Sequence, residues 1–97
     1  DVRSPWYDII QNSDSLQAVS SNDGSLTYVI FYEAGSIKTG FETISADKSC
    51  MVMKHDNRFY VSDPSRHHEQ VEITINGKKH IVKLNTWQLA GKTVVLE

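Results

Sequence analysis

Residues 71–84 of the chain read VEITINGKKHIVKL. Two runs that alternate between apolar and polar residues flank Asn76-Gly77, a dipeptide typical of the two-residue type I′ turn of a β-hairpin. Such a turn sets three cross-strand pairs: Ile75 with Lys78, Ile73 with His80 and Val71 with Val82. The stretch therefore predicts a hairpin whose register can be stated residue by residue.

This register decides which side chains meet the core, because paired residues share one face of a sheet. One face of the hairpin then carries the apolar set Val71, Ile73, Ile75, Val82 and Leu84. The other face carries Glu72, Thr74, Lys79, Ile81 and Lys83. A slip of one residue would turn Val82 and Leu84 toward water, so the hydrophobic pattern itself fixes the register.

Turn residues separate short β-rich runs along the rest of the chain as well, and no long segment shows a clean helical period. The expected strands are Tyr7–Gln11, Leu16–Ser20, Leu26–Tyr32, Ile37–Phe41, Cys50–Lys54, Phe59–Ser62, Val71–Ile75, Lys79–Leu84 and Thr93–Leu96. Ile44 is expected only as a lead-in toward Cys50. The pattern indicates an antiparallel sandwich or barrel, and we expect an all-β fold, a small antiparallel β-sandwich of about eight or nine short strands.

Two of these runs, Leu26–Tyr32 and Cys50–Lys54, carry apolar residues on both faces, which predicts central strands covered on both sides. The second run begins with Cys50, the only cysteine of the chain. It cannot form an internal disulfide, and we expect it to be a small core residue. Cysteine usage therefore does not indicate a redox compartment.

Length and charge narrow the possible functions. The 97 residues are expected to form a single domain over 1–97. The formal net charge is −2, and no basic run is longer than Lys78-Lys79, so no nucleic-acid partner is expected. No stretch approaches the about 20 apolar residues of a membrane span. The chain starts at Asp1 without a signal-peptide pattern, and we expect a piece of a longer polypeptide.

The densest polar cluster is Arg66-His67-His68-Glu69. Adjacent histidines can bind a metal ion, but their side chains diverge in an extended segment. No Cys-x-x-Cys or His-x-x-x-His spacing supplies the remaining ligands of a zinc site. We expect a solvated loop in which Arg66, His67 and His68 could contact a glycan, with no metal and no cofactor.

Trp6 and Trp87 flank predicted strands and are the aromatic residues that we expect as exposed platforms for sugar rings. No catalytic residue is predicted. There is no Gly-x-Ser-x-Gly elbow, and His55 with Asp56 lies in a tight turn that explains these residues without chemistry. Nothing places two carboxylates at the distance that a glycosidase requires.

Five segments, in order along the chain, resemble the C-terminal domain of the family 8 polysaccharide lyases, which act on chondroitin, hyaluronan or xanthan. They are Tyr7–Asn12 followed by Leu16–Val19, then Ala46–Met53, Phe59–Ser65, and the closing hairpin of Val71–Ile75 with Lys79–Leu84. The most recognisable of them is the alternating strand that ends in Asp63-Pro64-Ser65. The order and spacing are most similar to those of a chondroitin-type lyase.

This resemblance implies a small antiparallel β-sandwich from a bacterial, extracellular or periplasmic enzyme. Such enzymes cleave chondroitin sulfate or hyaluronan by β-elimination. Their catalytic residues belong to a helical domain and a central β-sandwich upstream, which would be the partners of this domain in the same polypeptide. No residue of this chain matches those catalytic motifs. The resemblance therefore implies a non-catalytic accessory domain that is not an enzyme alone.

Two alternatives remain open. An autonomous carbohydrate-binding module would use Trp6, Trp87 and the loop 66–68 to bind glycosaminoglycan, and a cell-surface adhesion sandwich would bind a protein. If the chain is part of a larger enzyme, we expect an exposed apolar patch where the neighbouring domain docks.

Overall fold

Ten strands make up the described part of the chain, which in this computed structural model comprises residues 7–40, 42–63, 68–84 and the backbone of 93–96. They are β1 (Tyr7–Asn12), β2 (Leu16–Ser21), β3 (Leu26–Phe31), β4 (Gly35–Lys38), β5 (Thr43–Ala46), β6 (Cys50–His55), β7 (Arg58–Ser62), β8 (Gln70–Ile75), β9 (Lys78–Lys83) and β10 (Thr93–Leu96). Over these ranges the structure contains no helix that could cross a membrane.

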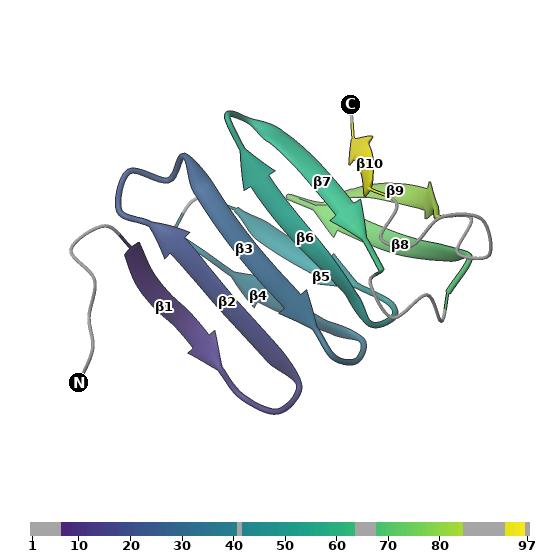
Figure 1. Cartoon of the computed structure of the whole chain (residues 1–97), viewed down its shortest axis with the longest axis horizontal. Coiled ribbons are helices and arrows are strands. Elements are labelled where there is room, and N and C mark those ends of the chain that lie inside the picture. Colours follow the sequence, from purple (N-terminus) through teal and green to yellow (C-terminus); the bar gives the residue numbers. More distant parts are fainter. Residues whose placement is uncertain (1–6, 41, 64–67, 85–92, 97) are drawn as a thin grey trace.

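The strands form two antiparallel sheets that lie one over the other (Figure 1). The large sheet has six strands in the order β1-β2-β3-β6-β7-β10, and the small sheet has four in the order β4-β5-β8-β9. The chain passes from one sheet to the other between β3 and β4, β5 and β6, β7 and β8, and β9 and β10. The predicted small antiparallel β-sandwich is confirmed.

One strand was not among those expected. The residues around Ile44 form β5 rather than a lead-in, and they pair with β4 on one side and β8 on the other. Ile44 is fully buried, whereas Thr43 is exposed on the opposite face. Four residues with only two apolar members give too short an alternation to be recognised in a sequence. The preceding strand also ends earlier than expected, at Lys38; Phe41 lies outside the described residues.

The β8–β9 hairpin has the predicted register. Its pairs include Ile75 with Lys78, Ile73 with His80 and Val71 with Val82. Asn76 and Gly77 have φ angles of 51° and 86°, as a type I′ turn requires. The five side chains expected to point inward are all buried: Val71, Ile73, Ile75, Val82 and Leu84.

The core lies between the two sheets and takes inward-facing residues from β2 to β9. The large sheet contributes Leu16, Ala18, Val29, Phe31, Cys50, Val52 and Val61. The small sheet and the residue after it contribute Ile37, Ile44, Ala46, Val71, Ile73, Ile75, Val82 and Leu84. Ile10 and Phe59 pack against this cluster from the large sheet. Cys50 is a buried free thiol, so its predicted core position is confirmed.

The prediction that β3 and β6 are covered on both sides is wrong for this chain. One face of each strand is buried against the small sheet, but the other face is partly open to solvent. Leu26 is 41% exposed, and Tyr28 and Met53 are half-buried. Only one layer covers the large sheet in the described residues, so its outer face keeps the apolar side chains that suggested a second cover.

Candidate functional site

Of the five residues predicted to contact a glycan, only His68 lies within the described residues. Trp6, Arg66, His67 and Trp87 lie outside them, so their role stays a prediction. His68 is half-buried, and its Nε2 is 3.0 Å from the Ser49 hydroxyl. Its main-chain N–H donates to Asp63 Oδ2 at 2.9 Å.

The structure thus brings together a serine, a histidine and an aspartate that sequence spacing did not single out. Ser49 comes from the β5–β6 turn, Asp63 directly follows β7, and His68 precedes β8. In a nucleophilic triad the carboxylate orients the imidazole through its ring N–H. Here Asp63, which is only 3% exposed, accepts the main-chain N–H of His68. The bond therefore holds the main chain of His68, two residues before β8, to Asp63 at the end of β7, which is a structural role.

Asp47 forms hydrogen bonds at the same end of the sandwich, between the β5–β6 turn and β8. Its Oδ1 accepts the main-chain N–H of Glu72 at 2.8 Å, and its own N–H donates to the Glu72 carbonyl at 3.2 Å. Burial raises the pKa of Asp47, but the hydrogen bond from Glu72 and the nearby Lys48 ammonium outweigh it, so the pKa lies below its ordinary value. The β5–β6 turn is thereby tied to β8 by an ionised carboxylate.

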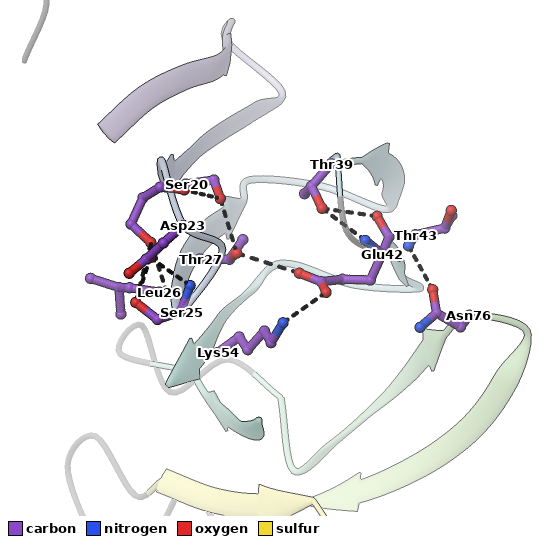
Figure 2. A network of polar contacts seen from close by, with 11 residues as sticks. Ser20, Asp23, Ser25, Leu26, Thr27, Thr39, Glu42, Thr43, Lys54 and Asn76 are labelled. Atoms are coloured by element: carbon purple, nitrogen blue, oxygen red, sulfur yellow. Dashed lines mark hydrogen bonds and ion pairs between the residues drawn. The ribbon is translucent and has the colours of Figure 1, made fainter. Parts of the chain in front are cut away.

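A polar network ties the layers together at the opposite end (Figure 2). Glu42, just before β5, forms an ion pair of 3.1 Å with Lys54 of β6, and the two side chains are only 4% and 12% exposed. Thr27 of β3 donates to the other carboxylate oxygen at 3.4 Å and lies 3.4 Å from the Ser20 hydroxyl. Thr39 closes the β4–β5 connection through its bonds to the main chain of Glu42. These contacts occupy both oxygens of the Glu42 carboxylate.

Cys50 has a buried thiol, a group that acts as a nucleophile when it is ionised. Burial, followed by the negative charges of Asp63 and Asp47, raises its pKa to about 12. The thiolate, which is the nucleophilic form, is therefore negligible at neutral pH. Among residues 7–40, 42–63 and 68–84, no three His, Cys, Asp or Glu side chains are grouped as a metal ion requires.

Within the described residues, the outer face of the large sheet carries apolar side chains that are not part of the core. Five side chains from five neighbouring strands of the sheet (β1, β2, β3, β6 and β7) form a continuous cross-strand row. We call it the apolar row, and it consists of Ile9, Val19, Tyr28, Met53 and Tyr60. Two shallow hollows of about 150 and 180 Å³ lie along it, and Tyr28 lines both. Ile9 is exposed and the other four side chains are half-buried, so the row is partly open to solvent; whether a neighbouring domain docks there stays a prediction.

Comparisons with known proteins identify the kind of domain. The model of the polysaccharide lyase family 8, C-terminal beta-sandwich domain, matches residues 8–72, which is more than half of the chain. The chain is also similar to a solved structure of chondroitinase AC lyase, an enzyme studied in complexes with oligosaccharides, with 30% identity and a TM-score of 0.76.

That similarity covers 95% of this chain but only 15% of the chondroitinase chain. No curated protein sequence matches significantly. The family match, the shared fold and the co-linear segments from Tyr7 onward agree with one another. The chain belongs to polysaccharide lyase family 8, in which it is a C-terminal β-sandwich domain.

Proposed function

We propose that this domain is a non-catalytic, structural part of a secreted lyase that cleaves an acidic polysaccharide of the chondroitin type by β-elimination. The proposal rests on the share of each chain that the similarity to chondroitinase AC lyase covers. Nearly all of this chain corresponds to about a seventh of an active chondroitinase, so most of that enzyme has no counterpart here. The reaction is assigned to that larger part.

The chemistry of the described residues supports an accessory role. The Cys50 thiol is protonated at neutral pH, because burial and two neighbouring carboxylates raise its pKa to about 12. The Glu42 carboxylate is held by Lys54 and Thr27, and Ser49 is hydrogen-bonded to His68. The Glu42 and Ser49–His68 contacts each hold two segments of the chain together. β-Elimination needs a base that is free to take a proton from the substrate.

The substrate class and the location rest on the similar enzyme. Chondroitinase AC lyase acts on chondroitin, which supports a glycosaminoglycan or a related acidic polysaccharide as the substrate of the whole protein. A long polysaccharide is degraded outside the cytoplasm, so an extracellular or periplasmic location follows from the proposal. Hyaluronan remains within the same class, because it shares the uronic acid at which elimination takes place.

The test compares the 97-residue chain with the longer polypeptide that contains it. Both are incubated with chondroitin sulfate and with hyaluronan, and the absorbance of the unsaturated uronide product is followed. We expect turnover by the longer polypeptide and none by this chain. Turnover by the 97-residue chain alone would overturn the accessory role, and an inactive longer polypeptide would overturn the lyase assignment.

The carbohydrate-binding alternative remains a prediction, since Trp6 and Trp87 lie outside the described residues. It is tested by titrating the chain with glycosaminoglycan oligosaccharides while tryptophan fluorescence is recorded. A salt-sensitive change that disappears in the Trp87→Ala variant would favour it over a purely structural role.

A further inference from the structure

We infer that the outer face of the small sheet binds an acidic polysaccharide through its lysines and hydroxyl groups. The kind of glycan rests on the proposed function, which the inference deepens by assigning a substrate contact to this domain. The residues that form this face were not among the glycan contacts predicted from the sequence.

Positive charge is concentrated in the small sheet. Its four strands contain four lysines and a single glutamate, although the whole chain has a formal net charge of −2. The lysines are Lys38 in β4 and Lys78, Lys79 and Lys83 in β9, and all four are exposed. A local cationic surface attracts polyanions even on a protein whose net charge is negative.

Hydroxyl groups form a row across the centre of this face. Ser36 of β4 lies opposite Ser45 of β5, and Ser45 lies opposite Thr74 of β8. Lys79 of β9 lies opposite Thr74 and ends the row. Ser45 donates to Ser36 at 2.9 Å, and hydroxyls of this kind can donate to and accept from sugar hydroxyls. The row therefore offers a polymer polar contacts across all four strands.

Lysines stand on both sides of this row and on the same face. Lys38 lies two residues beyond Ser36 on β4. Lys83 lies four residues beyond Lys79 on β9. Even spacings along a strand keep side chains on one face, and four residues span roughly 13 Å, so the two β9 lysines can contact different sugar units of one polymer. Ile81, which is 61% exposed between them, can pack on the apolar C–H groups of a sugar ring.

The charges on this face are open to a ligand. In the described part of the chain, Lys38 and Lys83 form no ion pair. Lys79 is 3.4 Å from Glu72 but keeps 63% of its side chain exposed. Exposed ion pairs of this kind are weak, so the Lys79 ammonium can exchange Glu72 for an anionic sugar. Asp47, directly after β5, already accepts the main-chain N–H of Glu72.

The composition of the face favours an acidic glycan over other occupants. Protein interfaces are depleted in lysine and enriched in aromatic residues, whereas the four strands of this sheet contain no Phe, Tyr or Trp. Without such rings a neutral sugar has no stacking platform. The ammonium groups of lysine match the carboxylates and sulfates of a chondroitin-type polymer.

Binding at this face raises the local concentration of the substrate. A polymer held by one part of a polypeptide reaches another part as an intramolecular partner. The gain is limited to polymers that are long enough to contact both places at once. A short oligosaccharide therefore gains nothing from the lysines, which separates their effect from an effect on the reaction itself.

The first test is an NMR titration of the 97-residue chain with chondroitin sulfate oligosaccharides at low ionic strength. We expect the amide signals of Thr74, Lys79 and Lys83 to shift. The signals of Met53 and Tyr60, in the apolar row, should stay in place. Added salt should reverse the shifts, because it screens contacts between exposed charges. Dextran oligosaccharides, which are neutral, should cause no shifts.

The second test compares two double variants that change the net charge equally. Lys79→Gln with Lys83→Gln removes two cations from the face and should lower the affinity about tenfold. Lys48→Gln with Arg58→Gln removes two cations outside the small sheet and should lower the affinity less than about twofold. Thermal unfolding shows whether each variant is folded. Lys79→Arg with Lys83→Arg keeps both charges and should bind as the parent does.

The same double variants of the longer polypeptide test the benefit to the enzyme. Lys79→Gln with Lys83→Gln should lower kcat/KM for long chondroitin sulfate several-fold and leave the turnover of short oligosaccharides unchanged. Lys48→Gln with Arg58→Gln should change neither. An unchanged kcat/KM for the long polymer in the first variant would overturn the role in holding the substrate.

Four further results would overturn the inference. Shifts confined to residues outside the small sheet would assign the glycan to another surface, and no shifts at low ionic strength would show that the chain does not bind it. Equal losses of affinity in the two double variants would reduce the effect to net charge. Equal affinity for polyglutamate would show a surface for any polyanion, without recognition of sugar. All four leave the lyase proposal intact, because that proposal is decided by the activity assay.

Discussion

At the scale of single residues, the Glu42–Lys54 pair is the contact whose loss should cost most. Replacing Lys54 by Met leaves the Glu42 carboxylate nearly buried without its partner. Because Lys54 keeps 12% of its side chain exposed, we expect a loss of about 3 kcal/mol in the free energy of unfolding, at the lower end for a broken buried pair. Urea denaturation followed by circular dichroism measures it.

An exposed ion pair of the same length is the control. Lys48 and Asp47 are also 3.1 Å apart, but their side chains are 40% and 39% exposed, so Lys48→Met should cost less than about 1 kcal/mol. Removing both charges of the buried pair, with Glu42→Leu and Lys54→Met together, should cost less than Lys54→Met alone. Equal losses for Lys54→Met and Lys48→Met would show that burial adds nothing to the pair.

The lowered pKa of Asp23 predicts how the stability of the fold depends on pH. The main-chain N–H of Ser25, with the hydroxyls of Ser25 and Ser21, lowers its pKa from 3.8 to about 2. A depressed pKa in the folded state means that this contribution to stability is complete above pH 3.8 and is lost as the pH falls to about 2. An NMR titration of the Asp23 carboxyl carbon should give the lowered value. In Asp23→Asn this part of the acid dependence should disappear, and an Asp23 pKa near 3.8 in the parent would contradict the assignment.

At the scale of elements, the sequence predicts those structures that local residues determine. The β8–β9 hairpin follows from one Asn-Gly dipeptide and the alternation on either side of it, and its register is confirmed in every predicted pair. β5 has no such signal, because its four residues give too short an alternation and one of its two neighbours, β8, comes from a distant part of the chain. The open outer face of β3 could not be predicted either, since apolar residues on both faces of a strand do not reveal whether a second layer is present in this chain.

Contacts between loops lie beyond sequence reasoning for the same reason. The Ser49–His68 hydrogen bond joins residues 19 positions apart, and the Asp47–Glu72 bond joins residues 25 apart. Both depend on the crossing from β5 to β6 and from β7 to β8, which no local pattern specifies. The candidate residue His68 was predicted as part of a solvated loop, whereas the structure uses its main-chain N–H and its imidazole as structural contacts.

The β8–β9 turn offers a test of the backbone geometry itself. Gly77 has a φ of 86°, and nothing lies within 4 Å of an added Cβ, so Gly77→Ala would be strained by conformation and not by contacts. We expect a loss of about 1 kcal/mol or somewhat more. The matched control is Gly40→Ala, which also meets nothing within 4 Å and needs no positive φ, and which should stay within about 0.5 kcal/mol of the parent. Equal effects of the two variants in thermal unfolding would contradict this account of the turn.

At the scale of the whole molecule, the two layers are joined by polar contacts at both ends of β6. Ser49 precedes the first residue of β6 and holds His68, whereas Lys54 near its end holds Glu42. The two residues are five positions apart along an extended strand, a distance of roughly 17 Å. Between them lies the apolar core to which Cys50 and Val52 belong. This arrangement predicts that the sandwich unfolds as one cooperative unit, since neither end can open without disturbing the core.

This cooperativity is tested by comparing the loss in unfolding free energy of a double variant with the losses of its two single variants. Ser49→Ala removes one hydrogen bond and should cost about 1 kcal/mol. If unfolding is two-state, combining it with Lys54→Met should give the sum of the two separate losses to within about 0.5 kcal/mol, because the sites share no partner and are well separated. Circular dichroism and fluorescence should also give coincident denaturation curves. Separate transitions would mean that the ends of the sandwich open independently, and a coupling energy clearly larger than this would mean that the two sites are not energetically independent.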